Sequence, residues 1–271
     1  MHTQPARLSI NATRAAAFAV AALVGTLIFA GAALADQRED FLAGRTNDCP
    51  NCDLTKAELK RRDLTGANLS GADLTKATLH EANLSNANLS GANLSEAVLN
   101  LANFRRANLA GANMNKALAY AANFAGADLS SAIMTGIRLQ TSDLTGAKLP
   151  GANLQNADLR LARAARADFS NAIVAYAKAD RFHASDANLE GANLYYAVLP
   201  EAEFRNSDFT GANLAGANFL RADLKGAHLD HADVRGASFR QSVMSGVTLD
   251  GAMWEQTMLS DGTVVSQPPG Q

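Results

Sequence analysis

The sequence predicts an all-β fold of the β-solenoid type. A pentapeptide of the form Ala-(Asn/Asp)-Leu-x-x returns 42 times between residues 52 and 259 without an insertion or deletion. Its third residue, called the centre below, falls at 54, 59, 64 and onward to 259, and it is Leu in 25 units. The residue two before the centre is Ala in 33 of the 42 units. A short period kept this strictly is typical of a repeat architecture.

The five-residue period excludes the two common regular elements. On an α-helix the centres advance by about 500° per unit, so they wander around the axis instead of forming an apolar stripe. On a flat strand an odd period sends successive centres to opposite faces, and half of them meet water. Every centre points inward only if the chain turns a corner in each unit and successive coils stack as parallel strands. We expect the centre and the Ala to face the axis. We expect the Asn or Asp before the centre, and the frequent Gly two after it, to form the corners.

Residues 82–91, which read ANLSNANLSG, contain two undistorted units. Such units resemble the pentapeptide-repeat family. The resemblance implies a right-handed quadrilateral parallel β-helix with one unit per side and four per coil, or about ten coils in a single domain. Residues twenty apart then form a column. Face one holds the centres 54 and 74, and faces two, three and four start at the centres 59, 64 and 69.

The N-terminus has the pattern of a secretory signal. Residues 1–14 contain two arginines and no acid, the apolar run 15–35 ends in Ala-Leu-Ala, and polar residues follow from Asp36. This pattern predicts a signal peptide over 1–35 that is cleaved after Ala35, which places the protein in the periplasm or outside the cell. The alternative is a membrane anchor formed by an uncleaved Ala15–Ala35 segment. Residues 1–35 hold two of the 24 basic and none of the 26 acidic residues, so cleavage changes the net charge from −2 to −4. This weak charge indicates no nucleic-acid partner, and no membrane span is expected after cleavage.

The segment 36–51 is predicted to cap the first coil. Residues 38–43 are expected to form about two turns of helix that stop at Gly44. Cys49 and Cys52, the two cysteines of the chain, form a CxxC motif. After an export signal this motif favours a structural disulfide, because the compartment is oxidising. A redox-active pair is the alternative.

The outward residues point to no enzyme. His228 and His231 flank an inward Leu and are expected to diverge around a corner, so they predict a solvated pair and not a metal site. The repeat contains no nucleophile elbow, phosphate-binding Gly loop or metalloprotease pair. We therefore expect no catalytic residues, no cofactor and no metal.

The repeat is least regular in its middle. The centres 164, 179 and 184 are Ala, and Phe182 takes a site that is normally Ala and is expected to refill part of the core. Tyr176 and Tyr196 are one coil apart and are expected to stack beside Tyr195. This region also gathers positive charge, and stacked like charges there are expected to favour an anionic partner. The predicted interaction patch comprises Arg160, Arg163, Arg166, Tyr176, Lys178, Arg181 and His183.

The last unit is followed by a segment, 260–271, predicted to be a turn and a tail that is disordered from residue 266. Met253 and Met258 occupy sites that usually hold Asn or Asp. Either residues 263–265 fold over them as a cap, or a second chain covers them in an end-to-end homodimer through the C-terminal coil.

Two classes of function follow. The preferred one is an exported, non-enzymatic structural or interaction scaffold that contacts a protein or another envelope component, including an envelope glycan or other anion. The alternative is a DNA mimic that shields a topoisomerase, as the family resemblance implies for some members. That role requires the cytoplasm and an acidic surface, which the signal and the weak charge disfavour.

Overall fold

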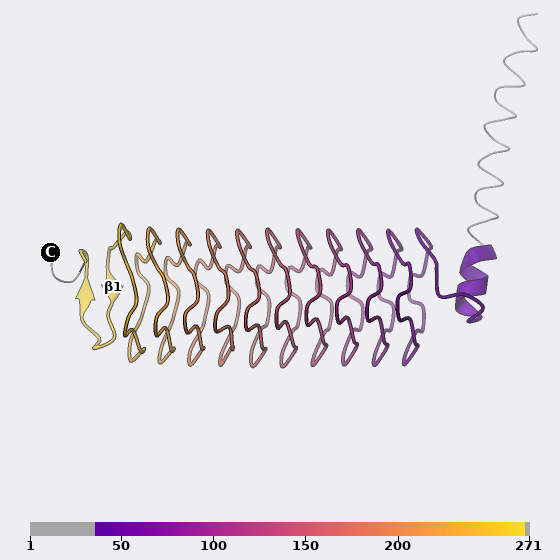
Figure 1. Cartoon of the computed structure of the whole chain (residues 1–271), viewed down its shortest axis with the longest axis horizontal. Helices are drawn as coiled ribbons and strands as arrows, with labels where there is room; N and C mark the ends of the chain where they lie inside the picture. Colours follow the sequence, from indigo (N-terminus) through magenta and orange to yellow (C-terminus); the bar gives the residue numbers. More distant parts are fainter. Residues whose placement is uncertain (1–35, 269–271) are drawn as a thin grey trace, which may run out of the picture. The chain divides into compact units, whose positions relative to one another are not determined.

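The computed structural model describes residues 36–268 and divides the chain into two parts, Met1–Thr46 and Asn47–Gln271 (Figure 1). The predicted signal, its cleavage point and the alternative anchor concern residues 1–35, which lie outside the described residues together with 269–271. In the first part a helix spans 36–42. It ends where the Gly44 N–H donates to the Phe41 carbonyl, and Gly44 has the left-handed φ of 75° that favours glycine after a helix. Among residues 36–268 no helix has the length and apolar character to cross a membrane.

The second part is a β-solenoid with a coil of twenty residues (Figure 1). Parallel bridges join the residue before each centre to the residue twenty positions later, from Asp53↔Asp73 to Ser238↔Met258. In the first coil the Leu54 N–H donates to the Asp73 carbonyl at 2.7 Å, and the Asp73 N–H donates to the Cys52 carbonyl at 2.9 Å. The predicted turn in each unit is therefore present. The expected parallel strands are reduced to single bridged residues, because a corner every five residues leaves no room for more.

Each corner is built by the residue two after the centre. The 42 residues at this five-residue spacing from Asn51, which lies two after Cys49, to Gln256 have a positive φ, and 27 of them are not glycine. The Ala57 N–H donates to the Leu54 carbonyl at 3.0 Å across such a corner, as in a type II turn, which needs a positive φ at its third residue. Left-handed geometry costs a non-glycine residue about 1–2 kcal/mol. The ladder of hydrogen bonds between coils must therefore offset strain at most corners.

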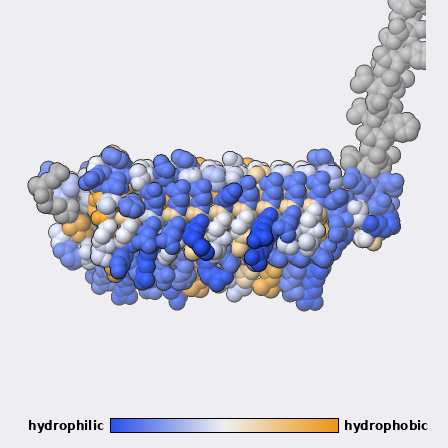
Figure 2. All heavy atoms as spheres, viewed as in Figure 1, coloured by the Kyte–Doolittle hydropathy of each residue, from blue (hydrophilic) through white to orange (hydrophobic). Residues whose placement is uncertain are grey.

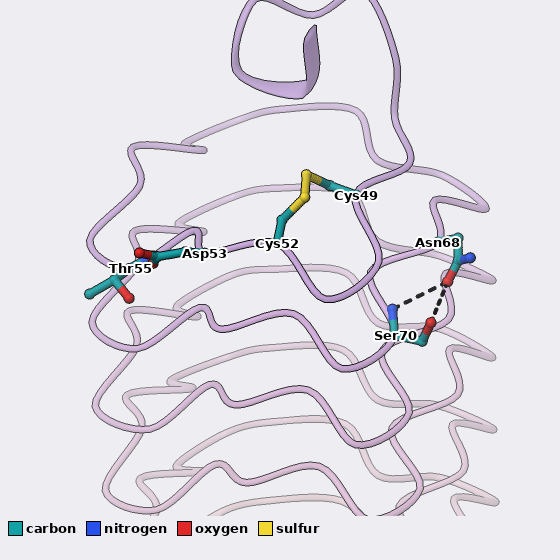
Figure 3. The surroundings of a disulfide bond; sticks show 6 residues. All are labelled: Cys49, Cys52, Asp53, Thr55, Asn68 and Ser70. Atoms are coloured by element: carbon teal, nitrogen blue, oxygen red, sulfur yellow. Dashed lines mark hydrogen bonds between the residues drawn. A yellow bond between two sulfur atoms is a disulfide. The ribbon is translucent and has the colours of Figure 1, made fainter. Parts of the chain in front are cut away.

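The Asn or Asp before the centre has a different role from the one predicted. It sits on the bridge and not in the left-handed corner, and its side chain stabilises the corner that follows. The Asp53 carboxylate accepts the Thr55 N–H at 2.9 Å, and Asn68 accepts the Ser70 N–H at 3.2 Å (Figure 3). Short polar side chains make this bond to the backbone two residues on. Asn side chains also bond along a column, as between Asn103 Nδ2 and Asn83 Oδ1 at 2.9 Å.

The core consists of the centres and the residues two before them. Nearly all of these side chains are buried, and Phe104 stacks on Phe124 with ring centroids 4.9 Å apart. In the irregular middle Phe182 is buried and packs against Phe169 and Phe204, with centroids 6.2 and 6.0 Å away. It refills the space left by the alanine centres, as predicted, and a void of only about 10 Å³ remains beside it. A void of this size holds at most one water molecule.

The chain ends in a two-stranded antiparallel sheet. Strand β1 (Thr257–Met258) pairs with strand β2 (Val264–Val265), and Thr257 lies opposite Val265 and Met258 opposite Val264. This pairing agrees with the predicted fold-back of 263–265 at Met258. It leaves Met253 48% exposed. The cap is therefore partial. Residues 266–268, expected to be disordered, are described as bends and irregular chain.

Candidate functional site

The predicted interaction patch extends over three corners of the coil. Arg166, Tyr176 and Arg181 occupy three different corners of the coil, because their positions in the twenty-residue period differ. The remaining members are divided among the faces between these corners. Five members, Arg160, Arg163, Lys178, Arg181 and His183, lie at the corner between faces two and three or on either side of it, as their phase in the period predicts, whereas Arg166 and Tyr176 stand at the two next corners.

Three of the predicted residues lie at or beside a hollow on face three. The hollow has a volume of about 470 Å³, and its walls include Arg163 and His183. Its full lining is Arg105, Asn123, Ala125, Asp143, Thr145, Arg163, Ala165 and His183. A second hollow of about 330 Å³ adjoins it and shares Arg105; Arg106 also lines this second space. Arg166 stands at the corner directly after Ala165.

The hollow exists because small residues coincide in two neighbouring columns. Ala125 and Ala165 take a position that holds Arg, Ser or Thr in the adjacent coils. At the following corner Gly126 and Gly146 succeed Arg106. A Cβ built on Gly146 would meet no atom within 4 Å, and one on Gly126 would meet the Arg106 Cγ at 3.6 Å. The space above Gly146 is therefore open, and the Arg106 side chain leans over Gly126 towards it.

The charges in this hollow are partly paired. Arg163 Nη2 lies 2.6 Å from Asp143 Oδ2, and His183 Nδ1 lies 3.1 Å from Glu203 Oε2. Burial tends to raise the pKa of Asp143, but hydrogen bonds from Thr145 and the Arg163 guanidinium outweigh it, so the pKa lies below its ordinary value. Arg163 and His183 are bridged neighbours, as predicted. Their side chains reach opposite ways along the column, each to an acid. The expected repulsion between them is thereby relieved within the chain.

Arg160 and Arg181 belong to a different site. They line a hollow of about 310 Å³ together with Tyr120, Gln140, Thr141, Leu161 and Asp180. Arg160 forms two hydrogen bonds with the Asp158 carboxylate, at 2.8 and 2.6 Å. Lys178 is bridged to Asp158 from the other side. The positive charge of this group is therefore partly balanced by Asp158, which pairs with Arg160.

Tyr176 belongs to a cluster of exposed tyrosines. Its ring stacks on that of Tyr196 with centroids 6.1 Å apart and planes 12° apart, which confirms the predicted stacking. Tyr195 meets both rings edge-on, at 5.6 and 4.6 Å. Burial, and then the neighbouring tyrosines, raise the pKa of Tyr195. The far face of Tyr196 rests on Gly216, so both faces of the Tyr196 ring are occupied.

Sequence reasoning missed Arg105 and Arg106. Both are exposed, and they precede Ala165 and Arg166 by sixty residues, which is three coils. Grouping outward residues by column across the whole repeat, and not only within its irregular middle, would have found them.

Within the described range 36–268, no three His, Cys, Asp or Glu side chains are arranged to hold a metal ion. His228 lies 3.2 Å from the Thr248 hydroxyl, and His231 lies over Gly251. Each histidine is directed to the next coil and not to the other histidine.

Cys49 and Cys52 lie at disulfide geometry across the first corner, with Cα atoms 5.4 Å apart (Figure 3). Both residues are buried. The Cys49 N–H donates to the Asn68 carbonyl at 2.8 Å, as the N–H of a centre does. Repeat-like backbone therefore reaches back to Cys49, inside the segment 36–51 predicted as a cap.

On the side shown in Figure 2, polar side chains run in rows and apolar ones form small separate spots. One solved structure shares the fold over most of this chain, and two others are similar to a lesser degree. HetL from the cyanobacterium Nostoc, a pentapeptide repeat protein involved in heterocyst differentiation regulation, is 27% identical, with a TM-score of 0.69 over 83% of this chain and 96% of its own. The fluoroquinolone resistance protein QnrB1 is 20% identical, with a TM-score of 0.29 over 75% and 89% of the two chains. A thylakoid-lumen pentapeptide repeat protein of Arabidopsis thaliana is 26% identical, with a TM-score of 0.27 over 42% and 69%.

The comparison with curated proteins found no match. The profile of pentapeptide repeats matches eight copies, in residues 52–91, 82–118, 122–160, 138–174, 187–226 and 217–253. It leaves out 175–186, where the alanine centres and Phe182 break the pattern. These matches span more than half of the sequence, and the chain belongs to the pentapeptide-repeat family.

Proposed function

We propose that the protein is an exported, non-enzymatic scaffold that presents outward side chains to a protein or another envelope component. One observation carries this proposal. The bridged ladder from Asp53 to Met258 buries two residues of each unit and leaves three facing outward, in columns held by the backbone. A surface of this kind holds contact groups in fixed positions without ordering them on binding, which lowers the entropic cost of recognition.

The proposed export rests on residues 1–35 and on the cysteines. An arginine-flanked apolar run ending in Ala-Leu-Ala precedes Asp36. Cys49 and Cys52 lie at disulfide geometry, which suits an oxidising compartment. The similarity to HetL supports a role in regulation or interaction, because that relative is described by the process in which it takes part and not by a reaction.

The test of the address is N-terminal sequencing of native protein after cell fractionation. We expect a chain that begins at Asp36, outside the cytoplasm. A chain that begins at Met1 in the cytosolic fraction would refute export and return the DNA-mimic alternative to consideration.

The test of the scaffold role is photo-crosslinking in intact cells. A photoreactive residue replaces an outward residue on face three, Thr145, or on face four, Ser90. The expected result is a discrete crosslinked product from at least one face. Uncrosslinked protein from both positions, with normal folding, would contradict a contact role for these faces.

A further inference from the structure

Positive charge remains uncompensated at the hollow on face three. Arg105 lines both parts of this hollow, Arg106 lines the adjoining part, and both side chains are exposed. Within residues 36–268 neither guanidinium lies within ion-pair distance of a carboxylate, in contrast to Arg163. Unpaired cations held on a fixed backbone attract an anionic ligand.

A second positive group stands at the other end of the same hollow. Arg163 lines it, and its guanidinium donates one hydrogen bond to Asp143, which leaves further N–H groups for a ligand. Arg166 follows at the adjacent corner. The two positive groups are three coils apart, roughly 14 Å at the spacing of bridged strands. A ligand that meets both groups must therefore be an elongated anion lying along the axis of the coil.

The floor of the hollow between the two positive groups favours one class of elongated ligand, a carbohydrate, over a peptide. It is made of Ala125 and Ala165 and offers Asn123, Asp143 and Thr145 as hydrogen-bonding side chains. Face three has no unpaired strand edge here, because each bridge is occupied from both sides. An extended peptide is usually held by such an edge together with side-chain pockets. A carbohydrate chain needs neither, since its hydroxyl groups bond directly to amide, carboxylate and hydroxyl side chains.

We propose that the hollow on face three binds an anionic carbohydrate chain, whose carboxylate or sulfate groups meet Arg105 and Arg106 at one end and Arg163 and Arg166 at the other. The inference rests on the proposed function, because it names the class of envelope component that this surface contacts. Asp143 holds Arg163 in place from within the hollow, so the arginine needs no ligand to adopt its position.

The experiment measures binding of residues 36–271 to four probes by calorimetry at low and high salt. Polygalacturonate carries carboxylates, dextran sulfate carries sulfates, neutral dextran is the uncharged control, and polyglutamate is the acidic-peptide control. We expect one or both anionic glycans to bind, neutral dextran and polyglutamate to bind at least tenfold more weakly, and added salt to weaken the binding.

Two pairs of variants locate the site. Arg105→Ser with Arg106→Ser is compared with Arg138→Ser with Arg240→Ser, which removes the same charge from other columns. Loss of two exposed charge contacts corresponds to a roughly tenfold weaker affinity in the first variant, and the second should remain within about twofold of wild type. Ala125→Glu fills the hollow with an acid and should abolish binding, whereas Ala110→Glu places the same charge on face four and should leave it unchanged. All six substituted positions face outward, and circular dichroism checks that each of the four variants folds.

Three results would overturn the proposal. The first is that neither anionic glycan binds the wild-type chain. The second is that, in each pair, the variant at the hollow and its control lose the same affinity. The third is that polyglutamate binds as tightly as the glycans and is equally sensitive to Ala125→Glu. The last result would assign the hollow to an acidic protein segment. None of these outcomes changes the N-terminal sequence or the crosslinking of the native protein, so failure of this inference is distinguishable from failure of the scaffold proposal.

Discussion

Gly216 offers a sharp test of how the corners and the exposed tyrosines depend on one another. It has a φ of 68°, and a Cβ built on it would lie 2.8 Å from Tyr196 Cζ and 2.9 Å from both Cε atoms. The ring of Tyr196 therefore rests on the glycine. Gly91 takes the same position in its unit with a φ of 64°, and a Cβ there would meet no atom within 4 Å. The two glycines form a matched pair that differs in the presence of the ring.

The cost of Gly91→Ala is backbone strain alone. Left-handed geometry costs alanine about 1–2 kcal/mol, and restriction of the unfolded chain returns about 0.4–1 kcal/mol. The net loss in the free energy of unfolding is then about 0.8 kcal/mol from the midpoints of the two ranges, and at most about 1.6 kcal/mol. Gly216→Ala carries the same strain and also pushes Tyr196 from its stack on Tyr176. Loss of an aromatic pair adds about 0.5–1.5 kcal/mol. We therefore expect Gly216→Ala to destabilise the protein by about 1 kcal/mol more than Gly91→Ala.

The assay is urea unfolding followed by circular dichroism and tyrosine fluorescence, repeated for both alanine variants in a Tyr196→Ser background. In that background the excess cost of Gly216→Ala should disappear, because the ring no longer occupies the space. Equal destabilisation by the two alanines in the wild-type background would refute the reasoning. So would an excess that persists without Tyr196.

Three further predictions concern charge, the cysteines and the C-terminal end. A hydrogen bond from Arg235 is the main cause of the lowered pKa of Asp233. The ionised Asp233 carboxylate therefore stabilises the folded protein fully above the unfolded pKa near 4, and this stabilisation is lost as the pH falls through the lower folded pKa. Asp233→Asn should therefore lose less stability than wild type between pH 6 and pH 3 in urea titrations, and an equal loss would contradict the assignment. Alkylation of native protein should find Cys49 and Cys52 unreactive until reduction, whereas two free thiols at the outset would disprove the disulfide; replacing both by Ser should speed hydrogen exchange only near the first coil. Deleting residues 263–271 removes the partner of β1 and should promote association in light scattering, and an unchanged molar mass would count against the cap.

The sequence predicted the repeat architecture because its period is incompatible with any regular element. Five residues per unit leave the centre inward in every unit only if the chain turns a corner each time, and this argument needs no knowledge of neighbours. It predicted nearly all of the core, including Phe182 as the residue that refills the irregular middle. It also placed Tyr176 on Tyr196, since residues twenty apart lie in one column.

The structural role of the Asn and Asp residues could not be predicted from the sequence, because two different physical reasons favour the same residue types. Short polar side chains tolerate left-handed geometry, and they also bond to the backbone two residues on. The structure assigns them the second role, as at Asp53 and Thr55. The left-handed position falls instead to residues such as Leu101 and Tyr196, whose own preferences oppose it. Pairing between coils enforces this geometry, and pairing is a property of the assembled coil.

The sequence by itself determined which side chains lie inside and which lie outside, because the five-residue period alone separates them. Only the tertiary structure decided which outward residues act together. It divided the predicted patch between three corners and the faces between them, paired Arg163 with Asp143 and left Arg105 and Arg106 beside open hollows. The physical reason is that the charge and space at any point of the surface depend on side chains twenty, forty and sixty residues away, and on the direction that each takes along its column.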